Sequence, residues 1–427
     1  MTIRWHQLTS AQFAGLAGGY GGAGAVAALA HAQLSKHLLL IKFIATAWSG
    51  DRTHRDRAVD VLTRAQAADP ERFARLLTDP LVGAWAARTT RRLRGAARSE
   101  MPLDVDCNHL SSVAAAAAAL TGVDADLVVH ASPGGVTLPG LGRALTAEPG
   151  HTPLAATVRR GRVTVARQTG WHPLRELTGS AERRELVVTL DDLGAYRGGH
   201  HAPPADRLSD AELRRWQDTF AGGWSLIARY DRERAGELAA GLRTLVPLAR
   251  LDAHSARSAT IRDAFGAFGL TRPSTPAEFA VMLVHEFQHS KLSGVLDIQP
   301  LTDPASTELH FAPWRTDPRP VGGLLQGLYA FLGIGQLWDR LRGAPGLAET
   351  ATRELALARE QVRWGLRSLD GSAALLPAGE RFAAGVRAAF ATLAARELPG
   401  RVVRRAEQDL HGAHQAWQRR NAEALRR

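Results

Sequence analysis

The pattern of apolar and polar positions divides the chain into a helical first part, a short β-rich part and a long helical last part. Across residues 8–99 apolar side chains recur at helical spacing, most clearly in residues 33–43. Pro70 and Pro80 mark the starts or the breaks of helices within this part. The alanine run at 114–119 predicts one further, closely packed helix.

Between residues 126 and 200 the pattern becomes that of short strands. Arg160 and Gly161 separate two apolar runs and predict a tight hairpin turn, because glycine tolerates positive φ. A loop rich in glycine, histidine and proline follows and suggests a boundary near residue 205. The predicted strands cover 126–130, 156–159, 163–166 and 185–190.

Beyond Ser209, which predicts a helix cap, the chain again shows helical periodicity. The expected fold is therefore mainly α with a small β-rich insert, in the α+β class. We expect a helical region at 1–125, a β-rich region at 126–205 and a helical region at 206–427. The predicted helices of the last region cover 209–219, 222–247, 276–292, 321–343, 349–368, 379–396 and 401–425.

The composition is that of a globular protein, with 45% hydrophobic and 22% charged residues among 427. The formal net charge of +11 produces a positive field that favours acidic partners. The arginines are scattered along the chain and form no recognisable nucleic-acid-binding module. We therefore do not expect nucleic-acid binding.

Cys107 is the only cysteine, which excludes an intramolecular disulfide, a four-cysteine zinc site and an iron–sulfur cluster held by this chain alone. A reduced, cytoplasmic location fits this composition. The uncharged stretch at 5–35 is interrupted by glycine and polar residues, whereas a membrane span needs about 20 predominantly apolar residues. We therefore expect a protein that is not inserted in a membrane.

One motif predicts a metal site, the HExxH sequence that runs from His285 to His289. The apolar run at 276–284 places this motif on a buried helix. Two histidines at positions i and i+4 lie on one helix face, where both imidazoles reach the same metal ion. Glu286 adjoins the first ligand and is positioned to act as a general base on metal-bound water.

The third metal ligand is less clearly indicated. Metzincin proteases carry glycine and histidine where this chain has Leu292 and Val295, which argues against that class. On a straight helix Asp297 lies about 12 Å beyond His289, so it needs a turn at Ser293–Gly294 to reach the metal. Two histidines and one carboxylate serve both zinc peptidases and non-haem iron oxygenases. The candidate third ligands are Asp297, Glu308, His310 and Asp317.

The loop at 310–320 contains three prolines, and two arginines flank an aspartate in it. Arg315 and Arg319 suit bidentate binding of a carboxylate from a cosubstrate or a substrate. The alternative is that Asp317 pairs with one of these arginines and fixes the loop. Gln326 and Tyr329 follow on the next helix and are expected to point into the same pocket, with core packing as the alternative for Tyr329.

Together these segments resemble the family of HExxH-motif peptide-modification proteins. The resemblance rests on HEFQHSKLSGVLD at 285–297, APWRTDPRP at 312–320 and GGLLQGLYAF at 322–331, and it extends to the N-terminal segment from His6 to Leu40. Related domains are fused to radical-SAM peptide-modifying enzymes. The β-rich region is the part that resembles the family least.

The resemblance implies the maturation of a ribosomally synthesised precursor peptide, together with other tailoring enzymes of the same pathway. The favoured chemistry is hydroxylation of a side-chain β-carbon by an iron(II) and 2-oxoglutarate-dependent dioxygenase. In this reading Asp297 completes the iron site, Glu286 orients a ligand or the substrate, and Arg315 or Arg319 anchors 2-oxoglutarate. Asp317, Gln326 and Tyr329 complete the expected cosubstrate and substrate surroundings.

Two alternatives remain open. A zinc peptidase would trim the precursor or its leader, with Glu286 as general base. A non-catalytic peptide-binding scaffold would keep the motif only as a structural site. In each case the β-rich region at 126–205 is a hypothetical docking element, because the edge of a sheet can pair with an extended leader peptide.

Overall fold

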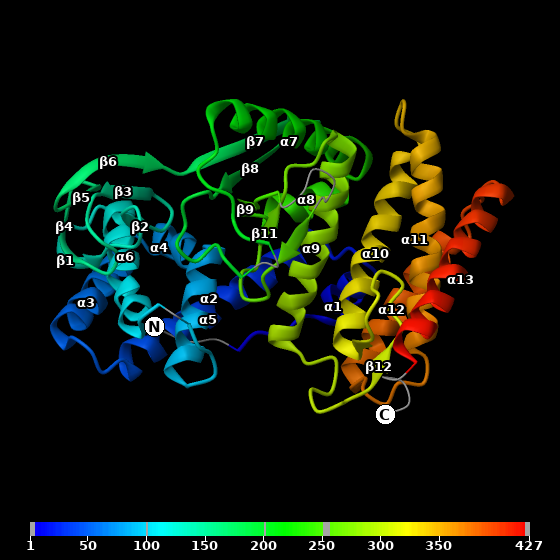
Figure 1. Cartoon of the computed structure of the whole chain (residues 1–427), viewed down its shortest axis with the longest axis horizontal. Coiled ribbons are helices and arrows are strands. Elements are labelled where there is room, and N and C mark those ends of the chain that lie inside the picture. Colours follow the sequence, from blue (N-terminus) through cyan, green and yellow to red (C-terminus); the bar gives the residue numbers. More distant parts are fainter. Residues whose placement is uncertain (1–4, 100, 200–201, 251–256, 423–427) are drawn as a thin grey trace.

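The computed structural model describes residues 5–99, 101–199, 202–250 and 257–422. Over these residues the protein is mainly helical, with 56% of the chain in thirteen helices and the strands in several small sheets. The prediction of a mainly α protein with a small amount of β-structure is confirmed at this level. The strands between residues 125 and 173 lie at one end of the molecule and the last helices at the other (Figure 1).

Local signals in the sequence start the first helices where they were expected. Pro70 and Pro80 occupy the first positions of their helices, and Asp69 and Asp79 cap them by accepting hydrogen bonds from first-turn amides. The alanine run forms the buried centre of the sixth helix. These helices are α1 (Ser10–Ala17), α2 (Gly22–Ala47), α3 (Arg52–Ala68), α4 (Pro70–Leu77), α5 (Pro80–Leu93) and α6 (Leu103–Thr121).

The cap of α5 gives a prediction, because burial raises the pKa of Asp79 to about 6 and the Asp191 carboxylate adds to the rise. An acid with a raised folded-state pKa stabilises the fold while protonated, and this contribution is lost as pH rises through the folded pKa. Asparagine keeps an oxygen that accepts from the Leu81 and Val82 amides without a charge. We expect Asp79→Asn to raise the free energy of unfolding by about 1–2 kcal/mol at pH 8 and by almost nothing below pH 4.

Thermal unfolding of the wild type and of Asp79→Asn at both pH values measures this difference. An Asp79→Asn protein that is less stable than the wild type at pH 8 would show that the ionised carboxylate is needed as a cap.

Two three-stranded antiparallel sheets cover α6. Their inward side chains pack on the alanine face of α6, which is why short side chains repeat there. Arg160 and Gly161 both have positive φ and connect β4 to β5, as the sequence predicted. The first sheet has the order β1 (Ala125–His130), β4 (Pro153–Arg159), β5 (Arg162–Val165), and the second β2 (Val136–Leu138), β3 (Gly142–Thr146), β6 (Gln168–Pro173).

A five-stranded mixed sheet joins residues from both sides of the expected boundary at 205. β9 pairs in parallel with both β8 and β11. The predicted helix at 222–247 is wrong at its end, because β9 occupies a fully buried apolar run whose pattern fits a helix equally well. The order is β10 (Ser258–Thr260), β11 (Ala267–Leu270), β9 (Thr244–Pro247), β8 (Arg184–Leu190), β7 (Arg175–Ala181).

Two helices pack beside this sheet. Ser209 caps the first through a capping box with Glu212, which confirms the predicted start. Asp231 ends this helix and caps the next one, so the break falls later than the sequence suggested. The two helices are α7 (Asp210–Tyr230) and α8 (Arg232–Gly241).

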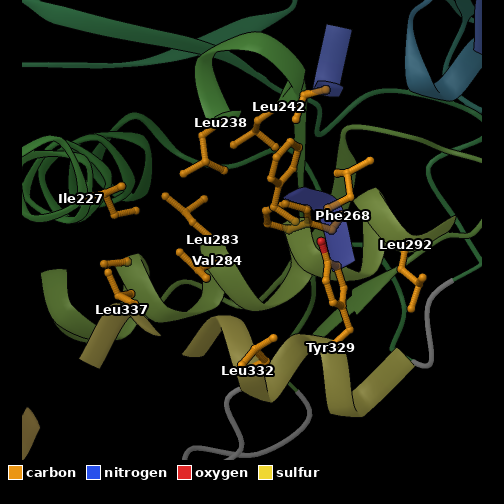
Figure 2. Close-up of a cluster of buried hydrophobic side chains, with 14 of the residues drawn as sticks. Ile227, Leu238, Leu242, Phe268, Leu283, Val284, Leu292, Tyr329, Leu332 and Leu337 are labelled. Carbon is orange, nitrogen blue, oxygen red and sulfur yellow. The ribbon is translucent and has the colours of Figure 1, made fainter. Parts of the chain in front are cut away.

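The next four helices, between residues 276 and 394, form a second, larger core with α7, α8 and the start of the chain. In Figure 2, Leu283 and Val284 of the HExxH helix lie among Ile227, Leu332 and Leu337 from neighbouring helices. These last elements are α9 (Pro276–Ile298), β12 (Leu309–His310), β13 (Arg319–Pro320), α10 (Val321–Leu341), α11 (Ala348–Leu369), α12 (Pro377–Ala394) and α13 (Gly400–Asn421).

The helix α2 connects the two cores. Of the described helices, it alone has the length and apolar composition that a membrane crossing requires. In the folded chain α2 packs against α5, α8 and α9, and Val26, Leu29 and Ile44 on it are fully buried. The expectation of no membrane insertion stays a prediction.

Candidate functional site

The HExxH motif lies in the middle of α9. This helix begins at Thr275, which forms a capping box with Glu278. Its apolar face is buried in the core, and this orientation turns His285 and His289 to the other face. The two imidazole rings meet edge to face, with their centroids 4.7 Å apart. The structure therefore brings together the two histidines that the sequence predicted as metal ligands.

Each histidine is held at its Nδ1 atom by a side-chain oxygen. The Nδ1 of His285 lies 2.9 Å from Oε1 of Glu286, and the Nδ1 of His289 lies 3.0 Å from Oε1 of Gln326 on α10. Both oxygens accept, so Nδ1 carries the proton and Nε2 keeps its lone pair. Within the described part of the chain, no protein group forms a hydrogen bond to either Nε2. Metal-binding histidines have this outer-shell arrangement.

The electrostatics favour a neutral His289 beside an ionised Glu286. Burial lowers the pKa of His289 to about 4, and the charge of His285 contributes to the decrease. Burial alone would raise the pKa of Glu286, but its hydrogen bond with His285 and the charges of both histidines lower the pKa to about 2. Glu286 is thus a carboxylate at neutral pH, and His289 is ready to donate its lone pair.

Glu286 is 1% exposed and both of its carboxylate oxygens are engaged. Its Oε1 holds His285, and its Oε2 accepts a hydrogen bond of 2.6 Å from the hydroxyl of Thr260 on β10. This set of contacts makes Glu286 a residue that orients His285. The part played by β10 was missed at the sequence level, because no strand was predicted there.

Asp297 is not brought to the histidines. The turn expected at Ser293–Gly294 does not form, and α9 continues without interruption to Ile298. Gly294 instead allows the close approach of Phe265, whose ring would lie 3.1 Å from a Cβ at this position. Asp297 therefore lies about 12 Å along the helix from His289.

Asp297 is engaged in contacts with α2. It accepts hydrogen bonds of 3.1 Å from Gln33 and 2.9 Å from Lys36, and Arg262 lies 3.4 Å away. These contacts fasten the last turn of α9. They assign Asp297 to the packing of the two helices rather than to the histidine face.

The other candidate third ligands also have partners elsewhere. Glu308 accepts a 2.6 Å hydrogen bond from Ser372 and lies 3.3 Å from Nε2 of His310. Over the described ranges, the histidine, cysteine, aspartate and glutamate side chains form no group of three or more that could hold a metal ion. The site that the structure assembles is thus a pair of histidines with two orienting residues.

The loop that carries the arginines is fixed by its own aspartate. Asp317 accepts a 2.9 Å hydrogen bond from Nε of Arg315 and a 3.1 Å hydrogen bond from Arg319. These bonds lower the pKa of Asp317. Of the two predicted interpretations, the structure shows the loop-fixing ion pair, and a carboxylate ligand at either arginine would compete with Asp317.

Two aromatic residues that the sequence did not single out connect this loop to the histidines. The indole of Trp314 stacks on the ring of Phe331, with centroids 4.9 Å apart. Phe331 in turn contacts His285 edge to face at 5.9 Å. The sequence shows that Phe331 follows Gln326 on the same helix. The position of Trp314 depends on the path of the loop and could not be predicted from spacing.

Tyr329 does not share the surroundings of Gln326. Its side chain is fully buried in the core, next to Phe382 and 5.7 Å from the ammonium group of Lys291. Figure 2 shows it among the apolar side chains of this core. The core-packing alternative is therefore the one that the structure shows.

An apolar groove of about 810 Å³ lies between α9, α10 and α11. Val281 and Met282 line it one turn before His285 on α9, and Phe331, which contacts His285, lines it from α10. Phe331 therefore connects the groove to His285, although neither histidine is among the lining residues. Its side chains include further apolar residues, namely Leu226, Ile334, Trp338, Leu347 and Leu357.

The hydrogen bond to Gln326 gives a prediction about metal affinity. Leucine at this position removes the oxygen that holds His289, so we expect Gln326→Leu to bind zinc about 10–100-fold more weakly than the wild type. Glutamate keeps an acceptor oxygen, so Gln326→Glu is expected to stay close to the wild type. Competition with a chromophoric zinc chelator measures both affinities. Equal weakening in the two variants would contradict an orienting role.

Comparison of the sequence with protein-family models and with curated proteins finds no match. The function therefore has to be argued from the geometry of the site together with the motif resemblance.

Proposed function

We propose that this protein is a metal-dependent enzyme that modifies a ribosomally synthesised precursor peptide. The favoured reaction is iron(II) and 2-oxoglutarate-dependent hydroxylation of a side-chain carbon. The observation that carries the proposal is the pair His285 and His289, with both Nδ1 atoms held and both Nε2 atoms free of protein partners in the described residues. The motif resemblance supports the choice of a peptide as substrate.

The residues present fit a metal ion in their donor chemistry. Neutral imidazole is a ligand for both iron and zinc, and each histidine has the outer-shell acceptor that fixes its tautomer. His285 and His289 would hold the ion, while water, cosubstrate or substrate would provide the remaining donors. When bound, the ion would supply the redox and Lewis-acid chemistry that amino-acid side chains lack.

The protein side chains orient the site and limit its protonation. Glu286 keeps the proton of His285 at Nδ1, and Gln326 keeps that of His289 at Nδ1. Thr260 donates to the second oxygen of Glu286, and the carboxylate keeps further lone pairs that can accept from water. The contacts of Glu286 with His285 and Thr260 fit the orienting role that the hydroxylase gives it, whereas a peptidase needs Glu286 as a general base.

The apolar groove supports a peptide as the substrate. Phe331 both lines it and contacts His285, and the groove has room for the apolar side chains of a peptide. Trp314 and the loop fixed by Asp317 flank the same aromatic residue. A peptide chain could thus lie along the groove and present one side chain to the histidine face.

The test is an anaerobic visible spectrum of iron(II)-loaded protein before and after addition of 2-oxoglutarate. The hydroxylase predicts a new metal-to-ligand charge-transfer band. If fully iron-loaded protein shows no band, hydroxylation through this cosubstrate is contradicted and the zinc peptidase becomes the better proposal. In that case zinc-loaded protein would cleave a precursor peptide, and Glu286→Gln would abolish cleavage without loss of zinc.

A further inference from the structure

A second feature of the molecule lies far from the histidines in the chain, between strands β5 and β6. These strands follow one another with only Ala166 and Arg167 between them, yet they belong to different sheets. A two-residue connection usually pairs its strands in a hairpin. Here each strand is the edge of its own sheet, and a cleft of about 1020 Å³ opens between them, lined by residues 161–171 and Leu141.

The edge of β5 presents unpaired main-chain groups to this cleft. The Ala166 amide donates to the Ala155 carbonyl on β4. In an antiparallel pair the main-chain groups of every second residue point to the partner strand, so those of Thr164 also point to β4. The main-chain groups of Val163 and Val165 must then face the other way. The Val165 amide confirms this direction, because it meets the side-chain oxygen of Gln168 at 3.3 Å.

The edge of β6 presents the same kind of groups from the opposite side. The Leu174 amide donates to the Leu141 carbonyl next to β3. Because the direction alternates along the strand, the main-chain groups of His172 point to β3 and those of Trp171 point to the cleft. The carbonyl of Pro173 also faces away from β3, since it accepts a hydrogen bond from Arg207. Two strand edges whose main-chain groups point away from their own sheets therefore border one cleft, and side chains meet two of these groups, the Val165 amide and the Pro173 carbonyl.

The charge of the cleft is positive. Arg162 and Arg167 line it, and no aspartate or glutamate is among its lining residues. Arg167 is 68% exposed and pairs with Glu148 at 3.0 Å, whereas Arg162 forms no ion pair among the described residues. A second copy of this chain would bring another positive charge of +11 to this surface, so self-association through the cleft is disfavoured.

We propose that this cleft binds an extended acidic peptide segment as an added strand between β5 and β6. Main-chain hydrogen bonds to both edges would provide affinity, and the two arginines would select acidic side chains. In Figure 1 the sheets of β5 and β6 lie at the opposite end of the molecule from α10 and α11, so the segment is distant from the residue that reacts. The strand edges and arginines of the cleft support the binding of an acidic peptide by themselves. The identification of this peptide with the precursor rests on the proposed function.

The test is fluorescence anisotropy of the full chain with a labelled decapeptide of alternating threonine and glutamate. We expect saturable binding that weakens at least 10-fold with Arg162→Glu and changes less than 2-fold with Arg160→Glu. Arg160 carries the same charge in the adjacent turn but does not line the cleft. Equal weakening in the two variants would overturn the proposal in favour of general attraction to a basic surface.

Strand addition is tested separately from charge. A decapeptide with every second amide N-methylated keeps its charges but can pair through only one of its two edges, so we expect it to lose at least 10-fold in affinity. Val163→Pro removes an amide that faces the cleft and leaves the β4 ladder intact, so the same loss is expected. Unchanged binding of the N-methylated peptide would overturn the proposal.

The site on α9 is not needed for this binding. His289→Ala and metal-free wild type are expected to bind the decapeptide as the loaded wild type does. Failure of the proposed reaction would leave these results unchanged, and failure of the peptide to bind would leave the metal site unaffected.

Discussion

Replacement of Lys291 by alanine is expected to remove about 3–5 kcal/mol from the free energy of unfolding. Lys291 lies on α9 just after the HExxH motif and is fully buried. Its ammonium group donates to Glu237 at 2.7 Å and to the Gly19 carbonyl at 2.9 Å. Alanine leaves a cavity and leaves these acceptors without this donor.

The size of the effect follows from the surroundings of Lys291. Glu237 also accepts from Arg234 at 3.1 Å, and Arg234 donates in turn to Gln288 of the motif and to the Gly19 carbonyl. Arg234, Glu237 and Lys291 are all fully buried. These side chains therefore join α8, α9 and the turn between α1 and α2, and one missing charge affects all of them.

Chemical denaturation of the wild type and Lys291→Ala measures this prediction. The matched control is the double variant Lys291→Met with Glu237→Gln, which fills the space and removes both charges. We expect it to recover more than half of the loss, because neither partner is left charged and buried alone. A Lys291→Ala variant within about 1 kcal/mol of the wild type would mean that the ammonium group contributes little to the network.

The second large effect concerns metal binding. We expect His289→Ala to lose more than about 100-fold in affinity for zinc or iron(II), more than the loss of an outer-shell partner causes. Activity on the peptide should fall with the bound metal. The variant should fold as the wild type does, because His289 lies on the partly exposed face of α9 while the opposite face carries the core.

The matched control is His31→Ala, the same substitution at an exposed position of α2. Affinity from chelator competition and the free energy of unfolding should both stay at wild-type values in this control. The scaffold alternative makes the opposite prediction for His289→Ala, namely lower stability with no loss of chemistry. Unchanged metal affinity of His289→Ala would contradict the assignment of this histidine as a ligand.

The sequence predicts the fold where the signals are local. The capping residue Ser209, the prolines at helix starts and the Arg160–Gly161 turn act within a few residues of themselves, and they appear in the structure as expected. β9 was predicted as helix because its buried apolar run has no distinguishing period. β10 and β11 were missed because they are only 3 and 4 residues long, too short to show a strand pattern.

The same distinction applies to the site. His285 and His289 were predictable because i and i+4 share a helix face. The position of Asp297 was not predictable, because a glycine before it can either end a helix or allow a neighbouring side chain to approach closely. Gly294 allows the close approach of Phe265, and α9 continues past it. Thr260 and Trp314 reach the site only through tertiary packing, and no spacing in the sequence indicates them.

The central claim is that His285 and His289 hold one metal ion through their Nε2 atoms. X-ray absorption at the zinc edge of the full chain loaded with one equivalent of zinc tests it most directly. The account predicts scattering from two imidazole rings with zinc–nitrogen distances of about 2.0 Å, and loss of that scattering from one ring in His289→Ala. A zinc environment of oxygen donors alone, or one that His289→Ala does not change, would contradict it.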